Sequence, residues 1–238
     1  MNNNYIIGII GAMDCEVDVL KQKLQNLEEL QHSNQKIYLG NLYGHKIILV
    51  KSGVGKVNSA ICTQYIIDKF NPDYIINTGI AGGIAKNLEV GDVVVGEKLV
   101  QYDFDVSAIG YAKGYMCTGI EPDKPTMFYS DENLIKSFEK SFDKEITLHK
   151  GIIASGDTFV SDENRKKEIH NLFNATAVEM EGCAIAQTST ANDVPFLVVR
   201  AISDLADNEA GKSHAFVEEE MAEVSSSAIE NLLKELSK

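Results

Sequence analysis

The run Phe196-Leu197-Val198-Val199-Arg200-Ala201-Ile202-Ser203-Asp204 is the clearest indication of the fold, because a largely apolar strand candidate leads into a carboxylic acid. Such runs are typical of strands in a parallel sheet whose two faces are both covered. Open α/β sheets bind their ligands beyond the carboxyl ends of these strands. Asp204 is therefore the first candidate for chemistry, although an acid at this position can also simply cap the next helix.

Short runs rich in Ile and Val alternate with longer amphipathic stretches, which is typical of an α/β fold. Strands are predicted over residues 5–10, 36–39, 46–50, 74–78, 92–100, 150–154, 175–178 and 196–202. Helices are predicted over residues 15–27, 56–69, 131–142, 162–172, 180–192 and 213–236. We expect one domain covering residues 1–238, with residues 110–125 forming a long lid or interface loop.

The charge balance excludes several classes of partner. Across 238 residues the formal net charge is -13, which repels phosphate backbones and anionic lipids. We therefore expect no nucleic acid and no membrane as partner, and no apolar segment is long enough to span a bilayer. The four cysteines lack metal-ligand spacing, so we expect reduced thiols, no metal and a cytoplasmic protein.

Three glycine-rich turns follow predicted strands. They are Gly8-Ile9-Ile10-Gly11, Ser52-Gly53-Val54-Gly55-Lys56 and Thr78-Gly79-Ile80-Ala81-Gly82-Gly83. None completes a dinucleotide-binding GxGxxG or a P-loop, so neither NAD nor ATP is favoured. Each turn alone can be explained by a tight strand-to-helix connection. Together they favour a backbone floor for a flat ligand such as a purine.

Several motifs occur in a specific order between about Tyr5 and Phe216. They are Gly11-Ala12-Met13 with Glu16, Lys51-Ser52-Gly53-Val54-Gly55-Lys56-Val57, Asn77-Thr78-Gly79, Ser155-Gly156-Asp157, Val178-Glu179-Met180-Glu181 and Arg200-Ala201-Ile202-Ser203-Asp204. Together they resemble the bacterial 5'-methylthioadenosine/S-adenosylhomocysteine nucleosidases of the purine nucleoside phosphorylase superfamily.

This resemblance implies a nucleoside phosphorylase-like α/β domain with a central twisted mixed sheet flanked by helices. It also implies a homodimer that acts in methionine salvage. The expected reaction is cofactor-free hydrolysis of the N-glycosidic bond of both nucleosides, which releases adenine and a 5-thio-substituted ribose.

The resemblance also implies roles for individual residues. Glu16 activates water, and Asp204 protonates the departing adenine. Further substrate contacts are expected at Ala81 and Gly82 beside the base, Phe159 and Val160 on its face and edge, Met180 and Glu181 at the ribose, Arg200 and Ser203 near the acid, and Phe216 over the thio substituent. Ile109 of the partner subunit is expected to complete the pocket.

Cleavage of a ribosyl C–N bond builds positive charge on the sugar and negative charge on the base, so an acid is needed at the leaving group. By analogy with O-glycosidases, an acid and a base flank the bond. Asp204 should then have a raised pKa. Judged alone, Glu16 and Glu181 can be ordinary first-turn acids and Met180 a core residue. Glu179 must point away from Glu181 and is expected to be structural.

The sequence contains only two arginines, Arg165 and Arg200. A phosphorylase usually holds phosphate through a bidentate arginine. Arg165 lies in a charged, solvated helix, and Arg200 is better placed to orient acidic side chains or water. The scarcity of arginine therefore favours water over phosphate as the nucleophile.

Three residues depart from the pattern that the resemblance implies. Ile80 occupies a position where Ser is usual near the acid, Ile109 replaces an aromatic residue, and Cys117 replaces a proline. These changes leave the preference for the 5' substituent open. A nucleosidase for futalosine-type or other 5'-modified nucleosides is an alternative. A non-catalytic nucleoside-binding module is a second one, which the presence of three carboxylates disfavours.

Overall fold

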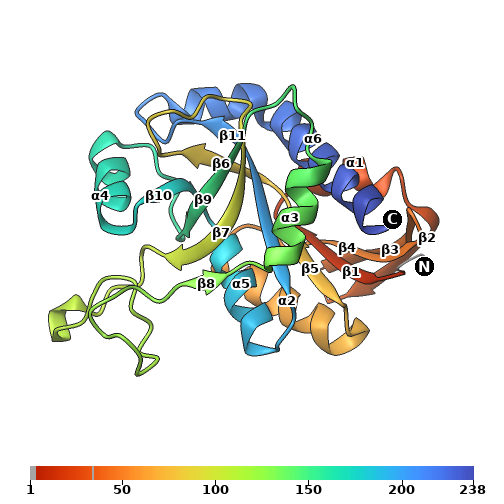
Figure 1. Cartoon of the computed structure of the whole chain (residues 1–238), viewed down its shortest axis with the longest axis horizontal. Coiled ribbons are helices and arrows are strands. Elements are labelled where there is room, and N and C mark those ends of the chain that lie inside the picture. The colour runs from red at the N-terminus through yellow and green to blue at the C-terminus, as the bar shows by residue number, and fades with distance from the viewer. Residues whose placement is uncertain (1–3, 34) are drawn as a thin grey trace.

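The computed structural model describes residues 4–33 and 35–238, with the side chains of residues 215 and 216 excepted. An 11-stranded mixed sheet runs through the molecule in the order β2-β3-β4-β1-β5-β11-β6-β10-β9-β7-β8 (Figure 1). The strands are β1 (Ile6–Gly11), β2 (Gln25–His32), β3 (Gln35–Leu42), β4 (His45–Lys51), β5 (Tyr74–Asn77), β6 (Ile80–Gly83), β7 (Val93–Gln101), β8 (Phe128–Tyr129), β9 (Leu148–Ser155), β10 (Ala175–Glu179) and β11 (Phe196–Asp204). Every predicted strand is confirmed.

Strand β11 joins two parts of this sheet. Its first residues pair with β5, its middle with β7, and its last with β6. Because β6, β10, β9 and β7 pair in turn, they lead back to β11 and curl this part of the sheet into a closed ring. The register places Asp204 opposite Gly82. The carboxyl end of β11 therefore meets the glycine-rich segment that forms β6.

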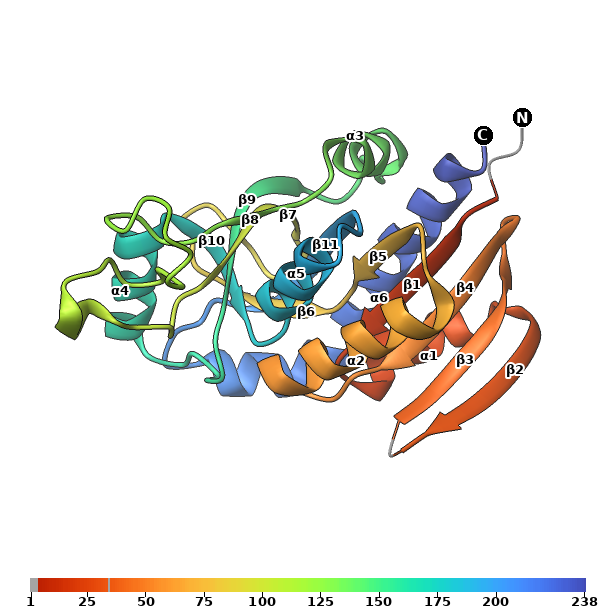
Figure 2. The ribbon, with the colours of Figure 1, turned by 90° about the horizontal axis from the view of Figure 1, so that it is seen from below.

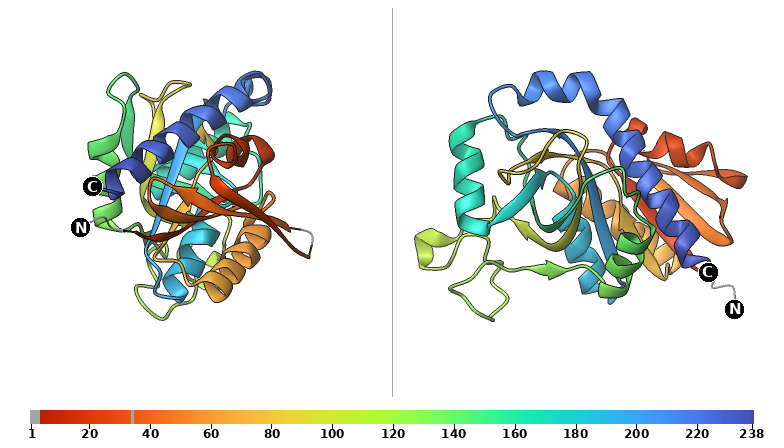
Figure 3. Two further views of the ribbon diagram at one scale, coloured as in Figure 1. Left: turned by 90° about the vertical axis from the view of Figure 1, so that its right-hand side faces the viewer. Right: turned by 45° about the horizontal axis from the view of Figure 1, so that its top comes forward.

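The helices cover both faces of the sheet. They are α1 (Asp14–Lys21), α2 (Lys56–Phe70), α3 (Glu132–Ser141), α4 (Glu163–Phe173), α5 (Gly182–Ala191) and α6 (Ala210–Leu236), with a 3-10 turn, η1, at Ser107–Ile109. Figure 3 shows α6 on one side of the strands and α2 with α5 on the other. Ile9 packs with the α1 and α6 side, whereas neighbouring Ile10 packs with the α2 and α5 side. This alternation explains why the strands are apolar on both faces.

Two predictions about local structure were wrong. The helix predicted over residues 15–27 ends at Lys21, and its last residues belong to the exposed edge strand β2, which pairs with β3 (Figure 2). Leu24 and Leu27 imitate helical spacing, but Leu24 is buried while Leu27 is 46% exposed. The third glycine-rich turn is largely strand β6 rather than a turn. β2 forms a hairpin with the next strand, β3, whereas β6 pairs with the distant strands β10 and β11.

Residues 102–127 form a long segment that projects away from the strands (Figure 1) and contains only the turn η1 as regular structure. Its role as a lid or an interface stays a prediction. Within the described residues, none of the helices has both the length and the apolar composition required to cross a membrane.

Candidate active site

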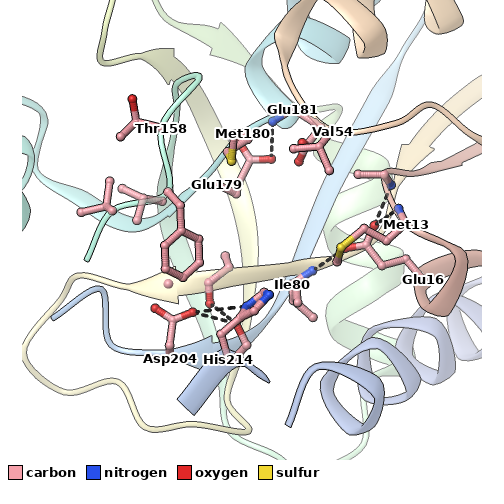
Figure 4. Close-up of a pocket in the computed structure, with 17 residues that line it drawn as sticks. Met13, Glu16, Val54, Ile80, Thr158, Glu179, Met180, Glu181, Asp204 and His214 are labelled. Carbon is pink, nitrogen blue, oxygen red and sulfur yellow. Dashed lines mark hydrogen bonds and ion pairs between the residues drawn. The ribbon is translucent and has the colours of Figure 1, made fainter. Parts of the chain in front are cut away.

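The predicted catalytic carboxylates come from separate elements and line one pocket (Figure 4). Glu16 lies in the first turn of α1, just after β1, and Asp204 ends β11. Glu181 is the N-cap residue of α5, directly after β10. A cavity of about 170 Å³ lies between these groups. The strands β1 and β11 both run parallel to β5, so Glu16 and Asp204 lie at the same edge of the sheet. Glu181 reaches the pocket from the end of β10, which runs antiparallel to β6.

Glu16 is 4% exposed and is held by three backbone donors. Its Oε2 accepts from the N–H groups of Ala12 at 2.6 Å and Met13 at 3.1 Å, and its Oε1 accepts from Ile80 N–H at 3.1 Å. Burial raises the pKa of Glu16, against the opposing effects of Arg200 and these N–H groups. A Cβ built on Gly79 would lie 2.9 Å from Cδ of Glu16. Glycine at this position therefore makes room for the carboxylate.

Asp204 is 2% exposed and accepts two hydrogen bonds. Ser203 Oγ donates to Oδ2 at 2.9 Å, and the N–H of Ala206 donates to Oδ1 at 2.9 Å. Burial raises the pKa of Asp204, and these two donors oppose that shift. A Cβ on Gly82 would lie 2.9 Å from Oδ1. Gly79 and Gly82 therefore leave room for two buried carboxyl groups.

Glu179, which was expected to point away from Glu181, also lines the pocket and is tied to strand β11. It forms a buried ion pair with Nη2 of Arg200 and accepts from Ser155 Oγ and from the Gly182 N–H at 2.6 Å. Arg200 also donates to Asn77 Oδ1 and to the carbonyl of Val199. Arg200 lies outside the set of described residues that line the pocket, so it acts from behind the acidic groups.

Glu181 faces the pocket and accepts from the Gly55 N–H at 2.8 Å through Oε1. Its burial and the neighbouring charge of Glu179 raise its pKa. Met180 lines the pocket beside it (Figure 4). Two of the three glycine-rich segments thus touch the carboxylates directly, through Gly55 and through the backbone of Ile80.

The structure brings most of the other predicted substrate contacts to this pocket. Ala81, Gly82, Phe159, Val160 and Ser203 all line it. Ile109 is 71% exposed and lies outside the pocket lining of the single chain, and the side chain of Phe216 lies outside the described part. Among residues 4–33 and 35–238, no three His, Cys, Asp or Glu side chains gather in a way that could hold a metal ion.

Sequence reasoning missed several lining residues, of which His214 is the most informative. His214 lies on α6, with Nδ1 3.8 Å from Oδ2 of Asp204 and its ring edge-on to Phe159 at 5.3 Å. Met13, Val54 and Thr158 also line the pocket. A lone histidine in a charged helix carries no sequence signal for this position, because only the packing of α6 brings it to Asp204.

A family model described as the phosphorylase superfamily matches residues 6–238. A 5'-methylthioadenosine/S-adenosylhomocysteine nucleosidase from Staphylococcus aureus is 42% identical over 97% of this chain and 100% of its own length. The chain belongs to this nucleosidase family within the phosphorylase superfamily.

Solved structures of similar proteins agree with this assignment. One is a nucleosidase of the same name from Streptococcus pneumoniae, bound to a transition-state inhibitor. It superposes with a TM-score of 0.91 and is 38% identical, covering 97% of this chain and 99% of its own. A futalosine hydrolase mutant of Helicobacter pylori superposes with a TM-score of 0.90 and is 32% identical, covering 97% of this chain and 99% of its own. The fold is therefore shared by enzymes with different nucleoside substrates.

Ile80 departs from the expected family pattern without leaving Asp204 unsupported. Its backbone N–H holds Glu16, and its side chain faces the pocket. Ser203 and Ala206 supply the hydrogen bonds to Asp204. The side chain of Ile80 thus adds apolar surface to the pocket, and Asp204 still accepts two hydrogen bonds.

Proposed function

We propose that this chain hydrolyses the N-glycosidic bond of 5'-methylthioadenosine and S-adenosylhomocysteine, which releases adenine and the 5-thio-substituted ribose. The observation that carries this proposal is the pair Glu16 and Asp204, both buried, both with raised pKa values and both lining one pocket. Membership of the nucleosidase family supports the same reaction.

Asp204 donates a proton to the base as the C–N bond breaks, so the adenine leaves as a neutral molecule. A raised pKa keeps part of the Asp204 population protonated at a higher pH than an ordinary aspartic acid allows. Ser203 and Ala206 fix the orientation of the carboxyl. Asp204 is in this way prepared to act as the general acid.

Glu16 removes a proton from the water that attacks the sugar carbon. Its three backbone donors fix the carboxylate, and its raised pKa makes it a stronger base than an exposed glutamate. Glu181, next to Met180, accepts from the ribose hydroxyls and places a negative charge near the cationic sugar of the transition state. The ion pair between Arg200 and Glu179 holds β11 and the end of β10 together beside these groups.

The decisive experiment measures free base released from 5'-methylthioadenosine, S-adenosylhomocysteine and futalosine, each with and without phosphate. We expect rapid release of adenine from both thionucleosides at a rate that phosphate does not change. Formation of the 5-thio-substituted ribose 1-phosphate would establish a phosphorylase instead. Hydrolysis of futalosine alone would favour the function of the H. pylori futalosine hydrolase, which has the same fold.

We further propose that residues 1–238 act as one nucleosidase domain in a cytoplasmic homodimer engaged in methionine salvage. Large apolar side chains on the surface support association: Val57 is 69% exposed, Ile61 61%, Ile109 71% and Ile120 73%. Free cysteines at positions 15, 62, 117 and 183 are usual in a reducing compartment.

A further inference from the structure

A second cavity adjoins the active-site pocket. The two share Ala12, Met13 and Val54 as a common wall, and Figure 4 shows Met13 and Val54 on the side of the active site where Glu16 lies. The two cavities are therefore neighbours across these three residues. The shared wall is apolar, so it suits an uncharged thioether.

Beyond the shared wall the lining becomes charged. Asp14 and Lys51 contribute from one side, and Glu218 and Glu219 contribute from α6. Lys51 Nζ donates to Asp14 Oδ2 at 2.8 Å, with its side chain 42% exposed. An ammonium group has three N–H donors, so Lys51 retains donors for a ligand carboxylate.

Glu218 lies at the boundary between the two cavities. Its Oε2 is 3.7 Å from Nε2 of His214, which lines the active site, and its Oε1 accepts from Cys15 Sγ at 3.5 Å. Burial and the charges of Glu16 and Glu218 raise the pKa of Cys15 to about 12, so this thiol stays a neutral donor. Beyond the hydrogen bond from Cys15, the carboxylate of Glu218 has further acceptor sites for a ligand cation.

We propose that this second cavity binds the α-amino-acid end of S-adenosylhomocysteine and so determines specificity within the function proposed above, on which it rests. The thioether crosses the wall of Met13 and Val54. The ammonium group of the substrate pairs with Glu218 and Glu219, and its carboxylate accepts from Lys51. 5'-Methylthioadenosine ends at the apolar wall and makes none of these contacts.

Charge and size can be separated with a third substrate, 5'-butylthioadenosine, which has a long thioether but no charges. The experiment compares kcat and KM for the three nucleosides in wild type, Lys51→Met and Glu218→Gln. We expect each variant to raise KM for S-adenosylhomocysteine about tenfold, as loss of one charge-assisted hydrogen bond predicts. The values for the two uncharged nucleosides should change less than about twofold.

Glu220→Gln is the matched control, because Glu220 is exposed on the same helix and outside the lining of both cavities. It should leave all three substrates unchanged. Added salt should raise KM for S-adenosylhomocysteine in wild type and have a smaller effect in the two variants.

Equal losses on all three nucleosides, or no loss on S-adenosylhomocysteine, would overturn the subsite. Either result is distinct from failure of the proposed function, in which the wild-type protein releases adenine from none of them. That outcome would remove both proposals together.

Discussion

At the scale of single residues, Asp204 and Glu16 are both carboxyls whose pKa values burial raises, yet their partners differ. Glu16 accepts three backbone N–H bonds, which favour its ionised form. Asp204 accepts from one N–H and one hydroxyl. The number of donors therefore suits Glu16 to the base and Asp204 to the acid.

Replacing Asp204 by Asn should lower kcat on 5'-methylthioadenosine by about a hundredfold or more, because the leaving adenine loses its proton donor. Asn has the same shape, so the circular dichroism spectrum should stay that of the folded protein. Asp123→Asn, at an exposed position, serves as the control. Near-normal turnover in Asp204→Asn would remove this residue from the mechanism.

The same variant should be more stable than wild type at higher pH. A carboxyl whose pKa is raised on folding holds its proton more tightly in the folded chain, so stability declines as pH rises from about 3.9, the unfolded value, through the folded pKa. Asn stays neutral and avoids this decline. The gain in free energy of unfolding, measured with urea, should be near zero at about pH 4 and grow by up to about 1.4 kcal/mol per unit of pKa difference. A gain independent of pH would contradict the raised pKa.

At the scale of elements, β6 and the residues before it leave space for the carboxyl groups of Glu16 and Asp204. The backbone around Gly79 and Gly82 runs so close to Glu16 and Asp204 that no side chain fits without moving a carboxyl group. The glycines were expected to form the floor for a purine, and they also accommodate the acids.

Gly79→Ala should therefore lower kcat by about a hundredfold, the usual effect of a displacement near 1 Å in a catalytic group. Steady-state kinetics and urea denaturation would measure it. Gly211→Ala is the control, because a Cβ there meets open space, and it should stabilise α6 by about 0.5–1 kcal/mol without changing kcat. Full activity of Gly79→Ala would show that the carboxylate of Glu16 can move freely.

The pair Glu179 and Arg200 ties the end of β10 to β11 across the intervening β6. Glu179→Ala leaves a buried guanidinium without its partner and should cost about 3–5 kcal/mol in free energy of unfolding. Glu209→Ala breaks the exposed pair with Lys212 and should cost less than about 1 kcal/mol. Similar costs for the two variants in urea denaturation would show that the buried pair contributes little.

At the scale of the whole molecule, the remaining prediction is that two copies of the chain form a homodimer. We expect sedimentation to give the mass of two chains, and Ile109→Asp to lower both the dimer fraction and kcat/KM, because a charge at an apolar contact is costly. Val90→Asp, at another exposed apolar position, is the control. A wild-type monomer with full activity would contradict the homodimer.

Many elements and site residues could be predicted because their signals are local. Continuous apolar runs such as residues 196–199 indicated the strands, and ordered motifs indicated Glu16, Glu181 and Asp204. The strands β2, β6 and β8 could not be predicted, since their residues lack strong strand patterns and become strands by pairing with β3, β10, β11 and β7. His214 was missed for the same kind of reason, because its role depends on where α6 packs.

The α/β class, the carboxylates at the strand ends and the position of Arg200 near Asp204 follow from residues close together in the chain, so they could be predicted. The fold was needed to show that β11 pairs with β5, β6 and β7, that Glu179 binds Arg200, and that a charged cavity adjoins the active site. These features depend on contacts between residues far apart in sequence, whose geometry is set when the strands pair and both faces of the sheet are buried.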